Sequence, residues 1–416
     1  MKYNVRDFYD SFMDDLGDFF ETTGSKNSIS VKRIKFKDFD EEQTKIKQAY
    51  NKAHKDYINE NIQRIEFLEK NLSHRLTNNF SDFNIDNIIP ILRPLPHDKS
   101  RVNKQDLYLV EYMRAYQKVK SRKSIGRENT FILEDHGGHL IKTMGVIILA
   151  SPLYFVGKRD SYLTWQNSPE YKLIREKGLT RMMHLSLCCA LPPYNKLGAA
   201  KLLSISAFSD IVYNDYCSKW RGKDKDNVDL AIITTSTPMG LTGTPFQRIK
   251  INSLFDMGHA PNKINSYLWN RIKTLNSPQE INSYSNAIEF LSNKSLEIAR
   301  ALNTNGVNSV EIAAINIMKS IGVKKKDLNI NKRGFFIGYL SDEALNSIKN
   351  GTKRNSRELV EWRSAISFFN SLYYNTNNET TCSKGNLTEH MSACIKRREK
   401  ANYCNEKEIF LSSTLS

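Results

Sequence analysis

Residues 183–212 read MHLSLCCALPPYNKLGAAKLLSISAFSDIV, an apolar run that stops at two prolines and continues through small residues. The apolar run is typical of a buried strand, and Pro192 and Pro193 are expected to make a rigid turn at its end. Small residues from Asn195 to Ala200 then reach the start of a helix, where backbone amides can approach a phosphate group. This stretch predicts a strand, a tight turn and a crossover helix.

Similar β-type runs lie on both sides of this stretch. They read FILED, HLIKTMGVIILAS and LAIITTSTP, and the run KRGFFIGYL from Lys332 adds one more. Because these short runs alternate with helical segments, and one helix crosses between two of them, the sequence predicts an α+β fold with a mixed sheet. We expect a helical N-terminal region before this core and a mostly helical C-terminal region after it.

Glycine and proline divide the chain into five parts. Residues 37–76 contain neither and carry apolar positions at helical spacing, which predicts one or two long helices. Pro90, Pro94 and Pro96 end that region and indicate a linker. The expected parts are a helical region at 1–85, the linker and a basic helix at 86–127, the sheet core at 128–260, an α+β part at 261–350 and a basic, partly disordered tail at 351–416.

The composition is that of a globular protein. With 416 residues and 40% hydrophobic side chains, the chain has material for two or three domains. The longest apolar runs are shorter than the roughly 20 residues of a membrane helix, and the first residues lack the apolar region of a secretory signal. Six cysteines are few for a disulfide scaffold, so we expect reduced thiols and a cytoplasmic protein without a membrane partner.

The net charge is +16, from 61 Lys and Arg against 45 Asp and Glu, and such a surplus attracts nucleic acid or another polyanion. Two basic regions, at 99–127 and 319–363, point to DNA or RNA as a partner, with a solvated charged surface as the alternative. Tyrosines 108, 112 and 116 have helical spacing, which favours a packed stripe over base-stacking side chains. The expected phosphate contacts are Lys118, Lys120, Arg122 and Lys123, together with Lys324, Lys325 and Lys326.

Two clusters contain side chains of the types that bind metals. The first is Glu134, Asp135, His136 and His139. Its sequence, LEDHGGHLI, is explained without a metal by a hairpin turn at the two glycines. The second, a weak zinc candidate, is Cys382, His390, Cys394 and Cys404. It lacks the close C-x-x-C spacing of structural zinc sites, so we predict no metal at either cluster.

The strand, N-x-x-G-x-A loop and helix of the opening stretch resemble the coenzyme A motif of the GNAT acyltransferase fold. That motif usually begins with Gln or Arg, whereas this chain has Asn195. The resemblance implies a GNAT-like core and an acyl-CoA site formed by Asn195, Lys196, Gly198, Ala199, Ala200 and Lys201. The candidate general bases for such an enzyme are Asp160, His184 and His259. The alternative is that the small residues only allow close packing of the helix on the sheet.

A wider resemblance covers half of the chain, from about Leu133 to Leu340. The runs GVIILASPLYFVGKRDSYLTWQ, LTRMMHLSLCCALPPYNKLGAAKLL and LAIITTSTPMGLTGTPFQRIKI are similar, in order and in sequence, to the core of the DruA family of Druantia anti-phage defence proteins. The motif residues are Arg159, Asp160, Trp165, Pro192, Pro193, Tyr194, Asn195, Thr234 and Thr235.

This resemblance implies a component of a multi-protein antiviral defence system in a bacterial cytoplasm, acting beside a helicase-like partner. It supplies no reaction, and no complete catalytic motif is visible in the sequence. Our first hypothesis is a subunit that contacts nucleic acid or other Druantia subunits through its basic surfaces. The alternative is a GNAT-like acyltransferase that modifies DNA or protein. For Arg159 and Asp160, a local ion pair at a strand exit is favoured over catalysis.

Overall fold

Seven strands form one mixed sheet in the part of the chain that the structure describes, in the order β3-β4-β5-β6-β7-β9-β8. Neighbours are antiparallel except β6 and β7, which are parallel. The strands are β3 (Pro90–Pro94), β4 (Glu128–Asp135), β5 (Lys142–Ala150), β6 (Met182–Ala190), β7 (Ile232–Thr237), β8 (Asn270–Ile272) and β9 (Gly334–Tyr339). The α+β class, the mixed sheet and the strands expected in the quoted runs are confirmed.

The computed structural model describes residues 3–23, 30–77, 87–117, 126–165, 169–195, 197–220, 229–237, 245–246, 268–272, 286–303, 309–328, 330, 334–352, 360 and 363–366. The helices near the sheet are α3 (Ile62–Leu72), α4 (Lys104–Tyr116), α5 (Gly157–Tyr162), α6 (Pro169–Thr180), α7 (Ala199–Ser206), α8 (Asp210–Trp220) and α12 (Asp342–Asn350). The other elements are α1 (Val5–Leu16), β1 (Phe20–Thr23), β2 (Ser30–Arg33), α2 (Phe39–Glu60), α10 (Asn293–Ala301), α11 (Val310–Ser320) and the 3-10 turns η3 (Lys99–Arg101), η4 (Asn286–Phe290) and η5 (Lys325–Leu328).

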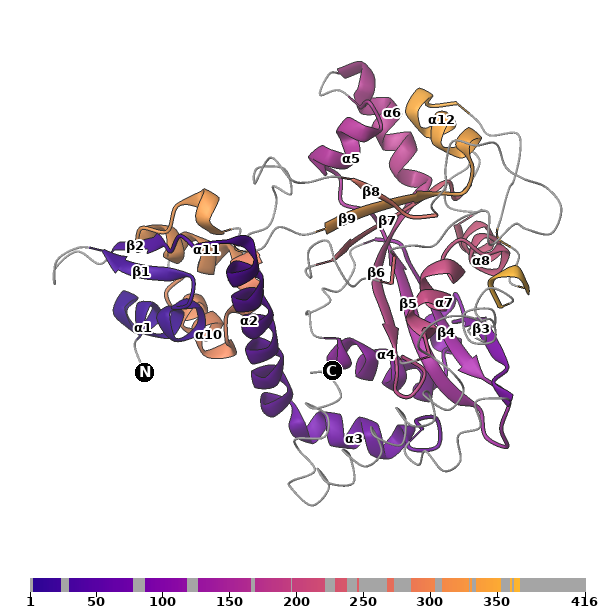
Figure 1. The fold of residues 1–416 in the computed structure, drawn as a ribbon, viewed down its shortest axis with the longest axis horizontal. Coiled ribbons are helices and arrows are strands. Elements are labelled where there is room, and N and C mark those ends of the chain that lie inside the picture. The colour runs from indigo at the N-terminus through magenta and orange to yellow at the C-terminus, as the bar shows by residue number, and fades with distance from the viewer. Residues whose placement is uncertain are drawn as a thin grey trace.

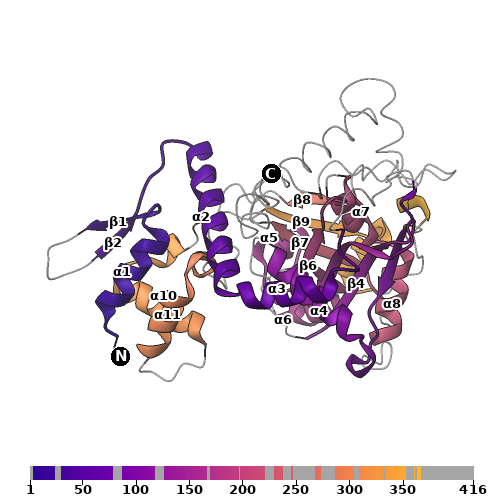
Figure 2. The same ribbon diagram turned by 90° about the horizontal axis from the view of Figure 1, so that it is seen from below.

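The one or two long helices expected within 37–76 are two helices, α2 and α3, which are separated at Asn61. The Asp38 carboxylate accepts a hydrogen bond from the Glu41 amide at 2.8 Å and so caps the start of α2. Figures 1 and 2 both show α2 running between the sheet and a second group of elements, formed by α1, β1, β2, α10 and α11. No helix in the described ranges is long and apolar enough to cross a membrane.

The strand β5 is buried on both faces, which explains its nearly continuous apolar sequence. Its residues alternate between two hydrophobic clusters, because successive side chains of a strand point to opposite faces. Ile147 packs in the cluster that includes α7 and α8, whereas Ile148 packs in the cluster that includes α3 and α4. Helices therefore cover both faces of the sheet.

The connection between β4 and β5 is the predicted hairpin, with a longer loop than its two glycines suggested. The strands pair antiparallel and the loop spans residues 136–141. A Cβ atom at Gly137 would lie 1.4 Å from the backbone oxygen of Asn87. Glycine is needed here because another part of the backbone approaches so closely.

The prolines at 90 and 94 do not form the expected linker. Pro90–Pro94 form β3, which pairs antiparallel with β4 and lies at one edge of the sheet. An edge strand tolerates proline because one side of the strand has no ladder hydrogen bonds to lose. The three-residue strand β8, at the opposite edge, was not predicted at all.

The helices α7 and α8 form the predicted crossover between β6 and β7. The parallel ladder between these strands covers only three pairs, from Met182–Ile232 to His184–Thr234. Beyond His184, β6 continues to pair with β5, while β7 continues to pair with β9. The two parallel strands therefore separate toward their carboxyl ends.

A third hydrophobic cluster joins the beginning of the chain to a segment far along it. Phe8, Phe12 and Phe20 pack with Phe290 and Met318 in this cluster. We call the body that they build, formed by residues 3–50 and 286–330 where described, the composite lobe.

Candidate functional site

The turn after β6 is fixed by a tyrosine buried beneath it. Pro192 and Pro193 are joined by a cis peptide bond, and the Tyr194 hydroxyl donates to Asp135 Oδ2 at 2.8 Å. Burial, together with the nearby Asp135 carboxylate, raises the pKa of Tyr194 above its ordinary value. Asp135 Oδ1 accepts from the amides of Ile89 and Gly137, at 2.9 Å each. One carboxylate thus ties the turn to β3 and to the β4–β5 loop.

The loop proposed for a cofactor phosphate makes many internal hydrogen bonds. Gly198 precedes α7 with φ +79°, a left-handed conformation that favours glycine. Backbone amides at 197, 198, 199 and 201 donate to backbone oxygens of Tyr194, Asn195 or Gly198. Few amides of this loop remain to bind a phosphate, and the small residues Ala199 and Ala200 instead lie against the sheet cluster.

Asn195 and the two lysines of the loop differ in their surroundings. Asn195 is half-buried, and its Oδ1 is buried without a hydrogen bond from the described residues. Lys201 is half-buried on the first turn of α7, and Lys196 lies outside the described residues. The Cys188 thiol, on β6, donates to the Ala200 backbone oxygen, with 3.7 Å between sulfur and oxygen.

The point where β6 and β7 separate carries polar side chains. His184 is half-buried, and its Nδ1 lies 3.0 Å from Thr234 Oγ1. The Thr235 hydroxyl donates to the Leu185 backbone oxygen at 2.9 Å. Thr234 and Thr235 are both buried, so these family-motif hydroxyls hold the two strands together where their ladder ends.

Arg159, Asp160 and Trp165 form one packed unit at the start of α5. The Arg159 guanidinium donates to Asp160 Oδ1 at 2.7 Å and to the backbone oxygens of Leu153 and Tyr154 at 2.6 and 2.8 Å. Its carbon centre lies 5.6 Å from the Trp165 ring. Burial is the largest influence on Arg159 and lowers its pKa, against the attraction of Asp160. The geometry is that of an ion pair holding the exit of β5.

This ion pair and the turn after β6 lie at opposite ends of the sheet. The turn is bonded to Met144, near the start of β5, through the Leu191 amide at 2.9 Å. The acceptors of Arg159 follow Ala150, the last residue of β5. Six residues of strand separate Met144 from Ala150, which corresponds to about 20 Å. Asp160 is therefore not brought to the loop at 195–201.

Several predicted residues lie outside the described ranges. They are Lys118, Lys120, Arg122, Lys123, His259, Cys382, His390, Cys394 and Cys404. Lys324 is described and exposed, and Lys325 and Lys326 belong to η5. Of the tyrosines of α4, Tyr112 and Tyr116 are buried, as expected for a packed stripe.

The described residues contain no group of three or more His, Cys, Asp and Glu side chains that could hold a metal ion. His136 Nε2 lies 3.3 Å from Glu134 Oε2, whereas His139 is exposed. Glu134 pairs with Arg75 and Arg93, whereas Asp135 accepts a hydrogen bond from Tyr194 in the turn after β6. The two acids of the LEDHGGHLI stretch thus serve different partners.

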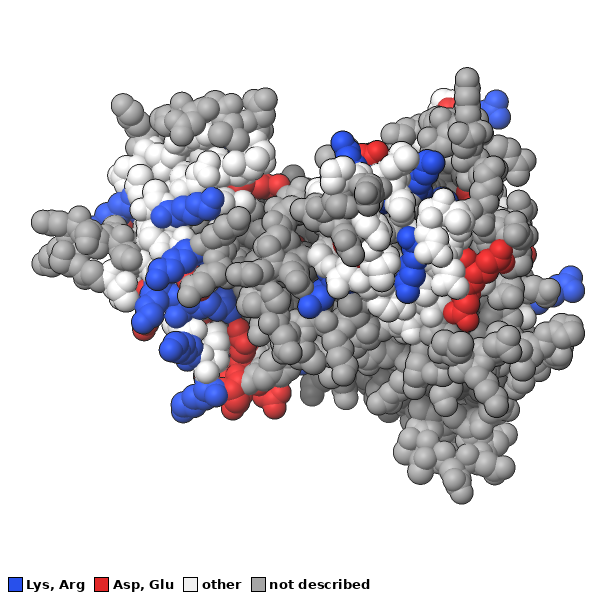
Figure 3. Space-filling view, turned by 90° about the horizontal axis from the view of Figure 1, so that it is seen from above, with Lys and Arg blue, Asp and Glu red and all other residues white. Residues whose placement is uncertain are grey.

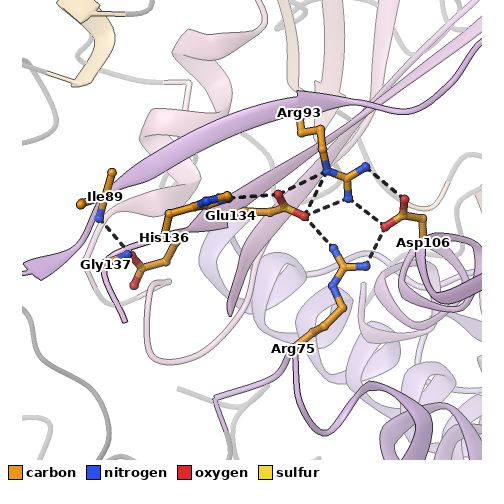
Figure 4. Close-up of polar contacts among 8 residues, drawn as sticks. Arg75, Ile89, Arg93, Asp106, Glu134, His136 and Gly137 are labelled. Atoms are coloured by element: carbon orange, nitrogen blue, oxygen red, sulfur yellow. Dashed lines mark hydrogen bonds and ion pairs between the residues drawn. The ribbon is translucent and has the colours of Figure 1, made fainter. Parts of the chain in front are cut away.

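A closed network of two arginines and two carboxylates joins four elements (Figure 4). Arg75, after α3, reaches Asp106 of α4 at 2.6 Å and Glu134 of β4 at 2.8 Å. Arg93, on β3, reaches the same two carboxylates at 2.9 and 2.8 Å. Asp106 and Glu134 are 4% and 5% exposed, so this four-charge network lies in the interior.

The network is electrically balanced. Burial alone would raise the pKa of Asp106 and of Glu134, but hydrogen bonds and the positive charges of the arginines lower both below their ordinary values. Burial opposes the charge of Arg93 as well, and bonds to the two carboxylates raise its pKa. Each arginine is bonded to both carboxylates, so the network fastens α3 and α4 to the sheet.

Sequence reasoning did not find this network. Glu134 was singled out only as a metal candidate, and Arg75 lies in a helical run that gives no sign of its distant partners. One signal was available: Arg93 is the only charged residue in the run PILRPLP, and a charge that is partly buried among apolar residues needs a nearby partner.

Comparison with known proteins places the chain in a family. The profile of the family described as Druantia protein DruA matches residues 40–333. The chain belongs to the DruA family. The matched residues run from α2 to the residue before β9, so the DruA family region includes the composite lobe in part and most of the sheet.

A relative in Escherichia coli (strain UMEA 4076-1), named Druantia protein DruA, is 25% identical over 175 residues. The aligned stretch is 41% of this chain and 40% of that DruA protein. No solved structure matches this chain.

Proposed function

We propose that the protein is a component of a bacterial anti-phage defence system of the Druantia type, acting in the cytoplasm with other Druantia subunits, a helicase-like protein among them. The observation that carries this proposal is the family match over residues 40–333. The test is the plating efficiency of phages on bacteria that express the complete set of subunits, with and without this chain. Equal plating on both strains would contradict the proposal.

Within that system, the protein contacts nucleic acid or its partner subunits through basic surfaces. The net charge of +16 supports this role, since counterion release favours binding to a polyanion. The tyrosines of the basic helix bear on the mode of contact. Tyr112 and Tyr116 are buried in the helix packing, and Arg64 and Lys104 lie over the Tyr108 ring at 5.5 Å each. Rings engaged in this way favour contact with a phosphate backbone over base stacking.

A salt titration on labelled double- and single-stranded DNA tests the nucleic-acid contact. We expect binding whose logarithm falls linearly with the logarithm of the salt concentration. Replacing Lys118, Lys120, Arg122 and Lys123 with alanine is expected to flatten that dependence. A matched control replaces exposed lysines of α6, Lys172 and Lys177, and should leave the slope unchanged. Absence of binding at low salt would exclude this part of the proposal.

A second candidate function is a GNAT-like acyl-CoA-dependent transferase that modifies DNA or protein. The observation that favours it is the sheet itself: four antiparallel strands are followed by a crossover to a parallel strand that separates from its neighbour. Ligands of mixed and parallel sheets bind where neighbouring strands part at their carboxyl ends. Such an enzyme would bind the donor at 195–201, and His184, which pairs with Ala150, would lie at the point where β6 and β7 separate.

Thermal-shift measurement with acetyl-CoA and coenzyme A tests this candidate. A specific site raises the unfolding midpoint in proportion to the logarithm of ligand concentration. The variant Gly198→Val, which places a β-branched side chain at a left-handed position, should remove that response. No shift at millimolar donor in the wild-type protein would exclude acyl-CoA as cofactor.

A further inference from the structure

The composite lobe presents a helix pair and a hairpin that come from distant parts of the sequence. The helices α10 and α11 pack together, and the hairpin β1–β2 lies against the end of α11. The Val31 amide donates to the Ile321 backbone oxygen at 3.2 Å, and Arg33 Nη2 donates to the Ile330 backbone oxygen at 2.9 Å. These bonds fix β2 beside the carboxyl end of α11.

The outer face of α11 is a stripe of exposed side chains. Ala313, Ala314 and Met318 face the interior of the lobe. The exposed residues are Ile312, Asn316, Lys319 and Ser320. They recur at intervals of four and three residues and thus lie along one side of the helix. Ile312 is 48% exposed, so an apolar side chain is accessible on this face together with an amide and an ammonium group.

Exposed lysines end this stripe, since Lys319 lies in the last turn of α11 and Lys324 follows the helix. Figure 3 shows Lys and Arg side chains gathered over the lobe, with acidic side chains beside them. Lys32 faces Glu21 across the β1–β2 ladder, so its charge is partly balanced. The exposed lysines described in α11 and just after it are Lys319 and Lys324.

We propose that this face of the composite lobe, which we call the α11 face (Ile312, Asn316, Lys319, Ser320 and Lys324), binds duplex DNA with α11 in the major groove. The dimensions fit, because the major groove of B-DNA admits one α-helix, whereas the deep, narrow groove of duplex RNA does not. Asn316 has the amide that pairs with adenine, Ile312 offers an apolar contact to a thymine methyl, and Lys319 reaches a phosphate or guanine. The proposal rests on the nucleic-acid contact proposed above and assigns it to a second surface.

The test measures duplex DNA binding by fluorescence anisotropy across a salt series. Compared are the wild-type chain, the double variant Lys319→Ala with Lys324→Ala, and the control Lys172→Ala with Lys177→Ala. Each lost phosphate contact lowers the salt slope by about 1, so the double variant should lose about 2 in slope and the control none. Far-ultraviolet circular dichroism and the unfolding midpoint verify that all three are equally folded.

Asn316→Ala separates base reading from charge. This variant should keep the salt slope and bind a random pool of duplexes with a relaxed sequence preference. If the wild type binds duplex DNA and both α11-face variants bind like the control, the α11 face is excluded, while the proposed nucleic-acid contact stands. If the wild type binds no duplex at low salt, both fall together. Stronger binding to single strands than to duplexes also overturns the proposal.

Discussion

Replacing Asp106 with asparagine removes one of the two carboxylates of the four-charge network. Its oxygens accept hydrogen bonds from Arg75 at 2.6 Å and from Arg93 at 2.9 and 3.0 Å. After the substitution, two guanidinium groups share the single charge of Glu134, and the interior holds an excess positive charge. Burial then opposes that charge without compensation.

The expected loss follows from this geometry. Removing one partner of a buried ion pair costs about 3–5 kcal/mol. Because the Arg93 side chain is 36% exposed and water can screen it, we expect the lower end, about 3 kcal/mol. With an unfolding entropy of about 2.1 cal/mol/K per residue, that loss lowers the unfolding midpoint of a 416-residue chain by roughly 3–4 °C.

Urea and thermal unfolding, followed by circular dichroism, measure this loss. The matched control is Glu111→Gln on the same helix. Glu111 pairs with Arg64, but both side chains are 46% exposed, so little change in the midpoint is expected. A second variant, Arg75→Met with Asp106→Leu, leaves Arg93 paired with Glu134 and should recover part of the lost stability. Equal midpoints for Asp106→Asn, Glu111→Gln and the wild type would refute the structural role of the network.

Three further predictions concern stability. The pKa of Asp106 and the pKa of Glu134 are lowered in the folded protein. Their contribution to stability is therefore present above the ordinary carboxyl pKa of about 4 and is lost as the pH falls through the lowered values. Urea midpoints measured from pH 7 to pH 3 should fall more steeply in the wild type than in Asp106→Asn. Arg159→Met leaves the Asp160 carboxylate buried without its cation and should lower the stability by about 3 kcal/mol. Arg159→Lys should not restore that stability, because lysine lacks the planar guanidinium that reaches two backbone oxygens. Wild-type unfolding midpoints for both variants would contradict this reasoning. Gly198→Ala forces a Cβ into a left-handed conformation at φ +79° and should cost about 1 kcal/mol in chemical denaturation, while an unchanged midpoint would show that this turn relaxes freely.

The elements of the sheet were predictable because their signals are local. Apolar runs of strand length gave β4, β5, β6, β7 and β9, and the crossover helix after β6 followed from its small and apolar residues. The prolines were less informative. Pro90 and Pro94 suggested a linker but lie in β3, because a strand at the edge of a sheet loses no ladder hydrogen bond to proline on its open side. The strand β8 is only three residues long and has no pattern of its own.

The site was harder to predict because its contacts are distant in sequence. The hydroxyl of Tyr194 meets Asp135, and Arg75 meets Glu134, through packing that no local pattern encodes. The resemblance placed Arg159, Asp160 and the turn at 192–195 in one motif, yet order along the chain does not give distance in the fold. These two features lie at opposite ends of β5.

The composite lobe also sets the order in which the protein can mature on the ribosome. Phe8, Phe12 and Leu16 of α1 are buried against a segment near Met318, which is synthesised some three hundred residues later. At about 5–20 residues per second, this apolar face waits roughly 15–60 seconds for its partner. During that time the sheet is completed only as far as β7, because β8 pairs with β9, which comes later still. The lobe thus closes only after Met318 has been synthesised, and until then the exposed apolar face of α1 is a natural substrate for chaperones.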